Sequence, residues 1–518
     1  MRSQRIATAC VAVLLALVAV AALPASNLTL GPLVQVSGAS PFAGCNLDDA
    51  AGQTGTAFIG SEVEPWIDVN PANTNNMIGV WQQDRWSNGG SRGLLAGVTA
   101  DGGATWTTVN DFKTTLCTGG TAANGGGYQR ATDPWVTVGP SGIAYQLSLS
   151  FNDLNPPITT FDFDHALLAS RSTDGGLTWS NPVVVKHDTA PTVFNDKQSI
   201  TADPTRPTNV YAVWDRLVFP GSERASVVAS FRTSSFSGPT WFAKSTDAGV
   251  TWQPAKQVWD PGQRDQTIGN QIVVQPNGTL VDIFTEFNNE NAKKMRGGFV
   301  RVLRSTDQGT TWAGPYTVAR LGTIGNVDPE TGDDVRTGDI IPDIAVDQTS
   351  AASATSGRLY AVWQDASFNS GQADAIAFSQ SLDGGLTWSN AIKVNKTPTN
   401  IPIGNQQAFT GSVDVSADGT IAATYYDFRN NTPGTPLLTD YWIVHCHPTS
   451  PTACANPANW VNELRITTAS FDMRQAPNAG GFFTGDYQGL ANAGAAFGAF
   501  FSQPHGTDPS STFFRRAG

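Results

Sequence analysis

One eight-residue pattern, S-x-D-x-G-x-T-W, occurs five times in this chain of 518 residues. The copies are Thr99–Trp106, Ser172–Trp179, Ser245–Trp252, Ser305–Trp312 and Ser381–Trp388, and only the first departs from the pattern, with Thr for Ser. Their aspartates lie 73, 73, 60 and 76 residues apart. A recurrence at this distance is typical of folds built from repeated supersecondary units. The repeat therefore constrains the fold more than the length does, although length alone suggests several domains.

Each copy of the octapeptide encodes a tight hairpin. Its Ser or Thr and its Asp can hydrogen-bond nearby backbone groups and so hold a turn. The glycine at the fifth position suits a backbone with positive φ. The Thr-Trp pair then enters a strand, where the indole can cover apolar surface. We therefore expect these five segments to hold hairpins and to take no part in chemistry.

A second repeat is interleaved with the first. Each copy is an apolar strand, a turn and a second strand, as in Pro65–Val69 with Met77–Trp81, and there are seven copies. The last copy, Tyr487–Ala491 with Ala496–Phe501, is the weakest. Together with the hairpins, the repeat gives four strands per unit, which is the blade of a β-propeller. The sequence thus predicts an all-β propeller of four-stranded antiparallel blades, with seven blades favoured and six as the alternative.

The N-terminal part of the sequence predicts a strand that completes the last unit and a signal peptide that precedes it. The seventh unit lacks an outer strand, and the strand-like run at residues 33–36 could supply it and close the ring. Arg2 and Arg5 precede an apolar run from Ile6 to Leu23, which predicts a signal peptide over residues 1–25. A retained membrane anchor is the alternative. We expect residues 26–518 to form one domain that is secreted or held at the cell surface, with no membrane span after the leader is removed.

The net charge limits which classes of partner the protein can bind, and the number of cysteines indicates the compartment in which it folds. The formal net charge is −12, with no basic run, which argues against nucleic acid and anionic membranes as partners. Four cysteines remain after the leader, and an even number in an exported chain suggests two disulfides. Cys446 and Cys454 are close enough to staple one hairpin, and Cys45 would then pair with Cys117. We expect a monomer.

In a propeller, the starts of the first strands and the ends of the second strands meet around the axis on one face. Three arginines recur at one register near the ends of second strands: Arg85, Arg216 and Arg429. Glu286 and Tyr426 share that position, whereas Glu64, Asp133, Asp196-Lys197, Arg336 and Asp486-Tyr487 precede or begin first strands. Arginine binds carboxylates through two parallel hydrogen bonds, so this face suits a carboxylated sugar. The alternative for each Asp-Arg dipeptide is a local ion pair that fixes the next loop.

The octapeptides and the blade pattern resemble the Asp-box, or BNR, repeats of the sialidase superfamily over roughly residues 60–515. The resemblance implies a secreted glycoside hydrolase of the exo-α-sialidase type that acts on an anionic sugar and requires no cofactor. It implies that Arg85, Arg216 and Arg429 bind the substrate carboxylate, with Arg336 and Glu64 also at the substrate. Tyr426 or Tyr487 would be the nucleophile, Glu286 its base and Asp133 the acid/base.

Two other classes of function stay open. One is a propeller that binds glycans or proteins without catalysis, because a fold does not settle function. The other is a polysaccharide lyase, in which Tyr, His or Arg abstracts and returns a proton, with His165 as a candidate. The acidic loops offer the oxygen ligands that Ca²⁺ prefers, but no EF-hand loop is present, so calcium is an optional structural ion.

Overall fold

The computed structural model describes residues 27–152, 164–190, 192–218, 237–288, 297–349, 355–434 and 436–518. The signal peptide predicted at residues 1–25 lies outside this part. The described chain is all-β, with 32 strands and only short 3₁₀ helices, as predicted. These helices are η1 (Leu116–Thr118), η2 (Ala122–Asn124), η3 (Ala366–Asn369), η4 (Ile403–Gln406), η5 (Ala453–Ala455), η6 (Pro457–Asn459) and η7 (Met473–Gln475). No helix in these ranges is long and apolar enough to cross a membrane.

Most strands form antiparallel groups of four that follow one another along the chain. The first three groups are β2 (Ala57–Val69), β3 (Met77–Trp86), β4 (Ser91–Thr99) and β5 (Thr107–Val109); β6 (Arg130–Val138), β7 (Ala144–Phe151), β8 (His165–Ser172) and β9 (Val183–Asp188); and β10 (Val193–Ala202), β11 (Val210–Val218), β12 (Thr240–Ser245) and β13 (Lys256–Trp259). The next three are β14 (Gln266–Val274), β15 (Leu280–Asn288), β16 (Gly297–Ser305) and β17 (Ala313–Leu321); β20 (Asp343–Val346), β21 (Leu359–Asp365), β22 (Ala375–Ser381) and β23 (Ile392–Lys393); and β24 (Ala408–Val415), β25 (Ile421–Asp427), β26 (Leu438–Cys446) and β27 (Trp460–Arg465).

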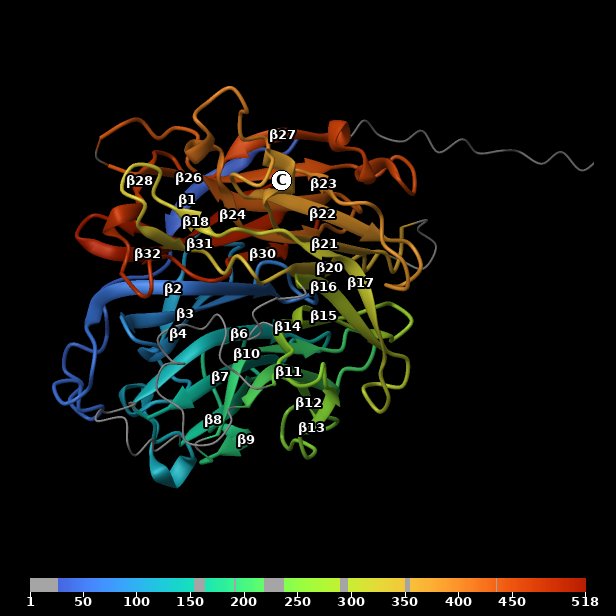
Figure 1. Cartoon of the computed structure of the whole chain (residues 1–518). Coiled ribbons are helices and arrows are strands. Elements are labelled where there is room, and N and C mark those ends of the chain that lie inside the picture. The colour runs from blue at the N-terminus through green and yellow to red at the C-terminus, as the bar shows by residue number, and fades with distance from the viewer. Residues whose placement is uncertain are drawn as a thin grey trace, which may run out of the picture.

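The last group joins both ends of the chain. Its strands are β30 (Gly489–Asn492), β31 (Phe497–His505), β32 (Asp508–Ala517) and, beside β32, β1 (Leu30–Gln35). In the antiparallel pairing of β1 with β32, Val34 lies opposite Phe514. Figure 1 shows the blue β1 lying among the orange and red strands of the C-terminal part. The remaining short strands are β18 (Asn326–Val327), β19 (Asp334–Arg336) and β29 (Phe482–Phe483), which form a small sheet, and β28 (Phe471–Asp472), which pairs with β26.

The first strand of each group contacts the first strand of the next. These contacts run from β2 through β6, β10, β14, β20 and β24 to β30, and β30 contacts β2 again. In Figure 1 the red strands β30–β32 accordingly lie next to the blue β2. Residues at the starts of these strands, which are far apart in sequence, are thereby brought close together.

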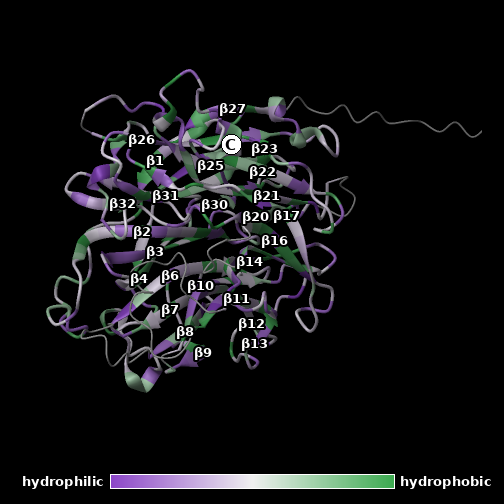
Figure 2. Ribbon diagram, viewed as in Figure 1, coloured by the Kyte–Doolittle hydropathy of each residue, from purple (hydrophilic) through white to green (hydrophobic). Residues whose placement is uncertain are grey.

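The core lies between neighbouring groups. One cluster packs Leu147 and Leu149 of β7 against Ile200 of β10 and Ala212 of β11. Figure 2 shows hydrophobic segments distributed over strands throughout the molecule. Burial of apolar surface at about 25 cal/mol per Å² is therefore shared among several interfaces, as expected where sheets stack side by side.

The five octapeptides form the hairpins expected of them and connect the third strand to the fourth in five of the groups. In the copy at Ser172, the Asp174 carboxylate accepts hydrogen bonds from the Thr178 N–H at 3.0 Å and from the Thr178 hydroxyl at 2.6 Å. The fifth residue, Gly176, has φ 98° and donates its N–H to the Ser172 hydroxyl at 2.9 Å. The same bonds recur in the other four copies.

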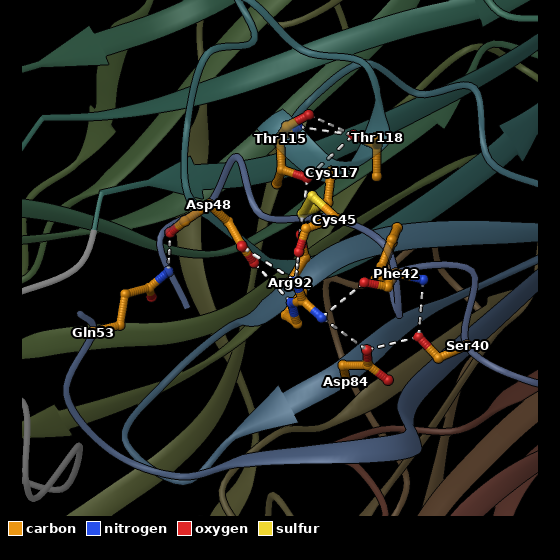
Figure 3. Close-up of a disulfide and its surroundings, with 10 residues drawn as sticks. All are labelled: Ser40, Phe42, Cys45, Asp48, Gln53, Asp84, Arg92, Thr115, Cys117 and Thr118. Carbon is orange, nitrogen blue, oxygen red and sulfur yellow. Dashed lines mark hydrogen bonds and ion pairs between the residues drawn. A yellow bond between two sulfur atoms is a disulfide. The ribbon is translucent and has the colours of Figure 1, made fainter. Parts of the chain in front are cut away.

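Both predicted disulfides are present, Cys45–Cys117 and Cys446–Cys454. Beside the first, Arg92 of β4 binds Asp48 at 2.7 Å and donates to the Cys45 carbonyl at 2.7 Å (Figure 3). The segment between β1 and β2 is thus held against the first group by a covalent bond and a buried ion pair. Two disulfides are consistent with an extracellular protein.

Candidate functional site

The backbone of the first strands is distorted at one recurring place. The pairing of β2, β6 and β10 with their second strands shifts register there, between Val63 and Trp66, Thr132 and Trp135, and Asp196 and Ser199. Inside each irregularity one residue has a left-handed conformation: Glu64 with φ 52°, Asp133 with φ 51° and Lys197 with φ 46°. Such a conformation costs about 1–2 kcal/mol for a residue other than glycine. Bulges of this kind change the direction of a side chain, and strained residues are concentrated at functional sites.

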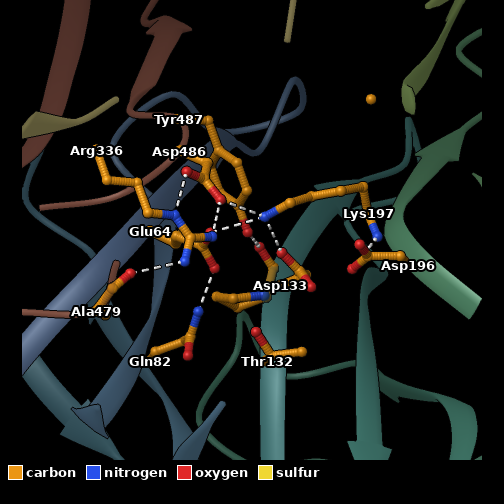
Figure 4. A network of polar contacts seen from close by, with 12 residues as sticks. Glu64, Gln82, Thr132, Asp133, Asp196, Lys197, Arg336, Ala479, Asp486 and Tyr487 are labelled. Atoms are coloured by element: carbon orange, nitrogen blue, oxygen red, sulfur yellow. Dashed lines mark hydrogen bonds and ion pairs between the residues drawn. The ribbon is translucent and has the colours of Figure 1, made fainter. Parts of the chain in front are cut away.

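The three strained residues meet through the ammonium group of Lys197. It lies 2.9 Å from Glu64 Oε1, 2.7 Å from Asp133 Oδ1 and 2.7 Å from Asp486 Oδ2 (Figure 4). These residues come from β10, β2, β6 and the segment before β30. Their side chains are at most 10% exposed, so the ion pairs are largely shielded from water. We call Glu64, Asp133, Lys197, Arg336, Asp486 and Tyr487 the axial cluster.

Arg336 is the member of the axial cluster that is most open to solvent. It binds Asp486 in a bidentate manner, Nη2 to Oδ2 at 2.5 Å and Nε to Oδ1 at 3.0 Å, while its side chain stays 21% exposed. Its guanidinium lies 4.3 Å from the ring centre of Phe483, and that of Arg85 lies 5.2 Å from the same centre. Arg85 is buried, and its Nε has no hydrogen-bond partner. The guanidinium groups of Arg85 and Arg336 thus both pack against the Phe483 ring.

Burial and neighbouring charges shift the carboxyl groups in opposite directions. Burial, with help from Asp133 and Asp486, raises the pKa of Glu64 to about 7 against the opposing effect of Lys197. Burial also raises the pKa of Asp133. For Asp486, Arg336 and Lys197 outweigh burial and hold its pKa far below the usual range. The cluster thus combines a carboxyl whose pKa lies near neutral pH with one that stays ionised, an arrangement typical of acid/base sites.

Aromatic side chains close the cluster on one side. Trp66 and Trp135 stack with ring centres 3.7 Å apart, and the Tyr487 ring meets both edge-on. The Tyr487 hydroxyl donates to the Pro134 carbonyl at 3.1 Å, and Lys197 Nζ lies 5.8 Å from its ring centre. Burial and the surrounding carboxylates raise the pKa of Tyr487 well above 10. The phenol therefore keeps its proton unless a base takes it.

Five of the nine predicted catalytic and substrate-binding residues lie together at this place: Glu64, Arg85, Asp133, Arg336 and Tyr487. The sequence pattern predicts Lys197 and Asp486 on the same face but indicates no role for them. The signal for Lys197 was its register, because it occupies in the third unit the position that Glu64 and Asp133 occupy in the first two. The sequence gives a weaker signal for Asp486, because this residue precedes a short and irregular strand.

The other two predicted arginines lie away from the cluster. Arg216 points toward the preceding group and binds Asp188 at the end of its outermost strand, at 2.5 Å. Arg429 binds Asp427 at 2.6 Å and Glu463 of the outermost strand β27 at 2.5 Å. Each guanidinium also lies on a tryptophan, Trp241 and Trp442 respectively. Arg216 and Arg429 are thus each held by a carboxylate of an outermost strand, whereas Arg85 shares the Phe483 ring with Arg336, so these contacts do not bring the three predicted carboxylate-binding arginines together.

The remaining predicted residues are also placed elsewhere. Tyr426 is fully buried among Phe409 and Tyr441, and its hydroxyl donates to the Ser502 carbonyl at 2.6 Å. Glu286 binds Arg301 at 2.9 Å within the fourth group and accepts from the Trp259 indole at 3.0 Å. The proposed Tyr426–Glu286 pair is thus contradicted, since each side chain is satisfied by partners of its own.

His165, the candidate for lyase chemistry, is not exposed to solvent. It begins β8, is fully buried, and its Nε2 accepts from the Asn195 N–H at 3.2 Å. This position gives no access to a substrate, so the residue favours no lyase chemistry.

Comparisons with protein-family models and with curated proteins find no match. Among solved structures, the chain is similar to a Hadza microbial sialidase at 14% identity and a TM-score of 0.46, covering 86% of this chain and 74% of that one. It is similar to an α-L-arabinanase of Penicillium chrysogenum at 12% identity and 0.45, covering 77% and 94%. It is also similar to a polysaccharide lyase acting as an ulvan lyase, at 12% identity and 0.41, covering 78% of each. At this degree of likeness, the activity has to be argued from the residues of this chain.

Proposed function

We propose that the chain is a seven-bladed β-propeller whose last blade is completed by β1. The cyclic contacts of the seven first strands support seven blades over six. The pairing of β1 with β32 supports a ring closed by both ends of the chain. A closed ring leaves no free radial edge and holds the axial cluster at its centre. We propose that the mature protein is secreted and works as a monomer, because one chain supplies every member of the cluster.

We propose further that the protein is a glycoside hydrolase that acts on an anionic sugar at the axial cluster. One observation carries this: an ammonium group shared by three buried carboxylates from three separate segments, two of them on strained backbone, beside a partly exposed arginine. Arg336, which shares the Phe483 ring with Arg85, has the charge and the partly exposed guanidinium to attract a carboxylate of the substrate. No metal or organic cofactor is needed for this chemistry.

The roles follow from the protonation states. Tyr487 is the candidate nucleophile, and Glu64 replaces Glu286 as its base. Because the pKa of Tyr487 is raised, its attack on the anomeric carbon has to coincide with transfer of its proton to Glu64, whose pKa of about 7 suits that task at neutral pH. Asp133, whose pKa is also raised, would protonate the leaving oxygen.

The test is turnover of fluorogenic sialosides and uronides, together with a search for unsaturated lyase products. With an active substrate, Glu64→Gln and Tyr487→Phe should each lower kcat about 10²–10⁴-fold. Arg336→Lys should mainly raise KM, since a lysine cannot form the bidentate contact. Glu286→Gln and Tyr426→Phe are the matched controls and should stay within about twofold of the parent. Full activity of Y487F, or equal loss in the controls, would remove these assignments.

A second candidate is a propeller that binds anionic glycans without cleaving them. It is favoured by the ion pairing of the cluster, since Lys197 and Arg336 already hold Asp486 in the structure. Calorimetric binding of a uronide or sialoside that depends on Arg336, with no turnover of any substrate, would decide for this function.

A further inference from the structure

Two histidines lie side by side at the C-terminal end of β26, His445 within the strand and His447 just after it. The two residues are two positions apart, and their ring centres are 4.9 Å apart. Cys446 lies between them and forms the disulfide with Cys454. The neighbouring strand β27 and the disulfide thus fix the backbone that carries both rings.

Three of the four ring nitrogens of this pair are buried without a hydrogen-bond partner. His445 is fully buried, and neither its Nδ1 nor its Nε2 has a hydrogen bond. The Nε2 of His447 is buried and unpaired as well. A buried polar atom without a partner costs about 1–3 kcal/mol. Three such atoms on two adjacent rings call for a ligand, because nothing in the described chain satisfies them.

The surroundings orient one ring for such a ligand. The Thr420 hydroxyl lies 2.8 Å from His447 Nδ1. When Nδ1–H donates to this oxygen, Nε2 carries the free lone pair, which is the second-shell arrangement found around histidines that bind metals. Asp418, in the turn between β24 and β25, accepts from the Thr420 N–H at 3.0 Å and adds a negative charge near the rings.

We propose that His445 and His447 bind one transition-metal ion, with Cu²⁺ and Zn²⁺ as the ions that imidazole pairs prefer. Among the described residues, His445 and His447 belong to no group of three Cys, His, Asp or Glu ligand atoms that lie within 4.8 Å of one another. Water therefore completes the coordination, and the affinity is lower than that of structural zinc sites with four protein ligands. The role is structural, since the ion would fix both rings beside the Cys446–Cys454 disulfide and the turn that carries Thr420.

Titration calorimetry of the chain with ZnCl₂ and with CuCl₂ tests the proposal. We expect one ion per chain for the parent and for His187→Gln, the control, which changes an exposed histidine paired with Asp164. His445→Gln and His447→Gln should each weaken binding at least tenfold, as even losses in the outer shell do. Binding by the double variant that equals the parent's, or no binding by the parent, overturns the proposal.

A second measurement needs no variant and so does not depend on how well a substituted chain folds. Cu²⁺ with ascorbate oxidises the side chains that hold the ion, and mass spectrometry of peptides locates them. Oxidation confined to His445 and His447 supports the site. Oxidation centred on His165, His187 or His505 overturns it.

Discussion

The octapeptide hairpins and the axial cluster use carboxylates in opposite ways. In a hairpin, Asp174 is exposed and bonded to groups within four residues of itself. In the cluster, Asp486 is buried and bonded to Lys197 and Arg336, which are 289 and 150 residues away. The first arrangement is local and repeats wherever its sequence repeats. The second exists only when segments from distant parts of the chain have packed together, so the two should respond differently to substitution and to pH.

Loss of the central cation should have the largest effect. Lys197→Met leaves Glu64, Asp133 and Asp486 buried around an apolar side chain. Removing one partner of a buried ion pair costs about 3–5 kcal/mol. We expect a loss of that size in the free energy of unfolding, measured with urea at pH 7.5. The loss should shrink at pH 5, because the carboxyls can then take up protons. A loss below about 1 kcal/mol at both pH values would show that water already screens these charges.

The two kinds of carboxylate should give the stability a maximum in mildly acidic solution. Burial raises the pKa of Asp68 and Asp343 to about 6 and that of Asp414 to about 7. The folded chain then holds protons that the unfolded chain releases above pH 4, so the stability falls as the pH rises from about 4 to 7. The hairpin aspartates act in reverse. Hydrogen bonds from Thr105 and Thr251 lower the pKa of Asp101 and Asp247 to about 2.

Stability due to such a lowered pKa is complete above pH 4 and is lost as the pH falls through about 2. Urea unfolding between pH 2.5 and 8 should therefore show a maximum near pH 4–5, with a decline of about 2 kcal/mol or more toward pH 7.5. The variant Asp414→Asn should flatten the decline on the alkaline side only. A stability that rises from pH 5 to 7.5 would contradict the raised pKa values.

A hairpin substitution should have a smaller effect. Asp174→Ala removes the acceptor of the Thr178 N–H and of the Thr178 and Ser172 hydroxyls. We expect a loss of about 1–2 kcal/mol, the usual range for a side chain that caps a turn. Asp174→Asn keeps one acceptor oxygen and should recover part of the loss. Equal losses in both variants would mean that the negative charge matters more than the hydrogen bonds.

The sequence predicts the local arrangement far better than the distant one. The octapeptide determines its own hydrogen bonds, so the hairpins, their glycine conformations and the four-strand unit followed from the residues. The convergence of Glu64, Asp133 and Tyr487 followed from the shared register of the first strands. The contacts of Arg216 and Arg429 could not be predicted in this way. Two side chains at one register can extend toward a first strand or toward an outer strand. That choice depends on the carboxylates of other strands, Asp188 and Glu463, which no local pattern reveals.

Substitution of Arg216 should have the smallest effect on stability and activity. It tests directly whether this arginine serves the substrate or only holds an outer strand. Its guanidinium is held by Asp188 of the second strand group and by Asn195 of the third, and it lies on the Trp241 ring. Arg216→Lys keeps the charge and loses the bidentate geometry, so we expect a stability loss below about 1 kcal/mol. On any substrate that the protein turns over, kcat/KM should stay within about twofold of the parent, whereas Arg336→Lys should lower it by tenfold or more. If R216K instead loses as much activity as R336K, the substrate must extend from the axis to the outer strands, and the site would be larger than the axial cluster.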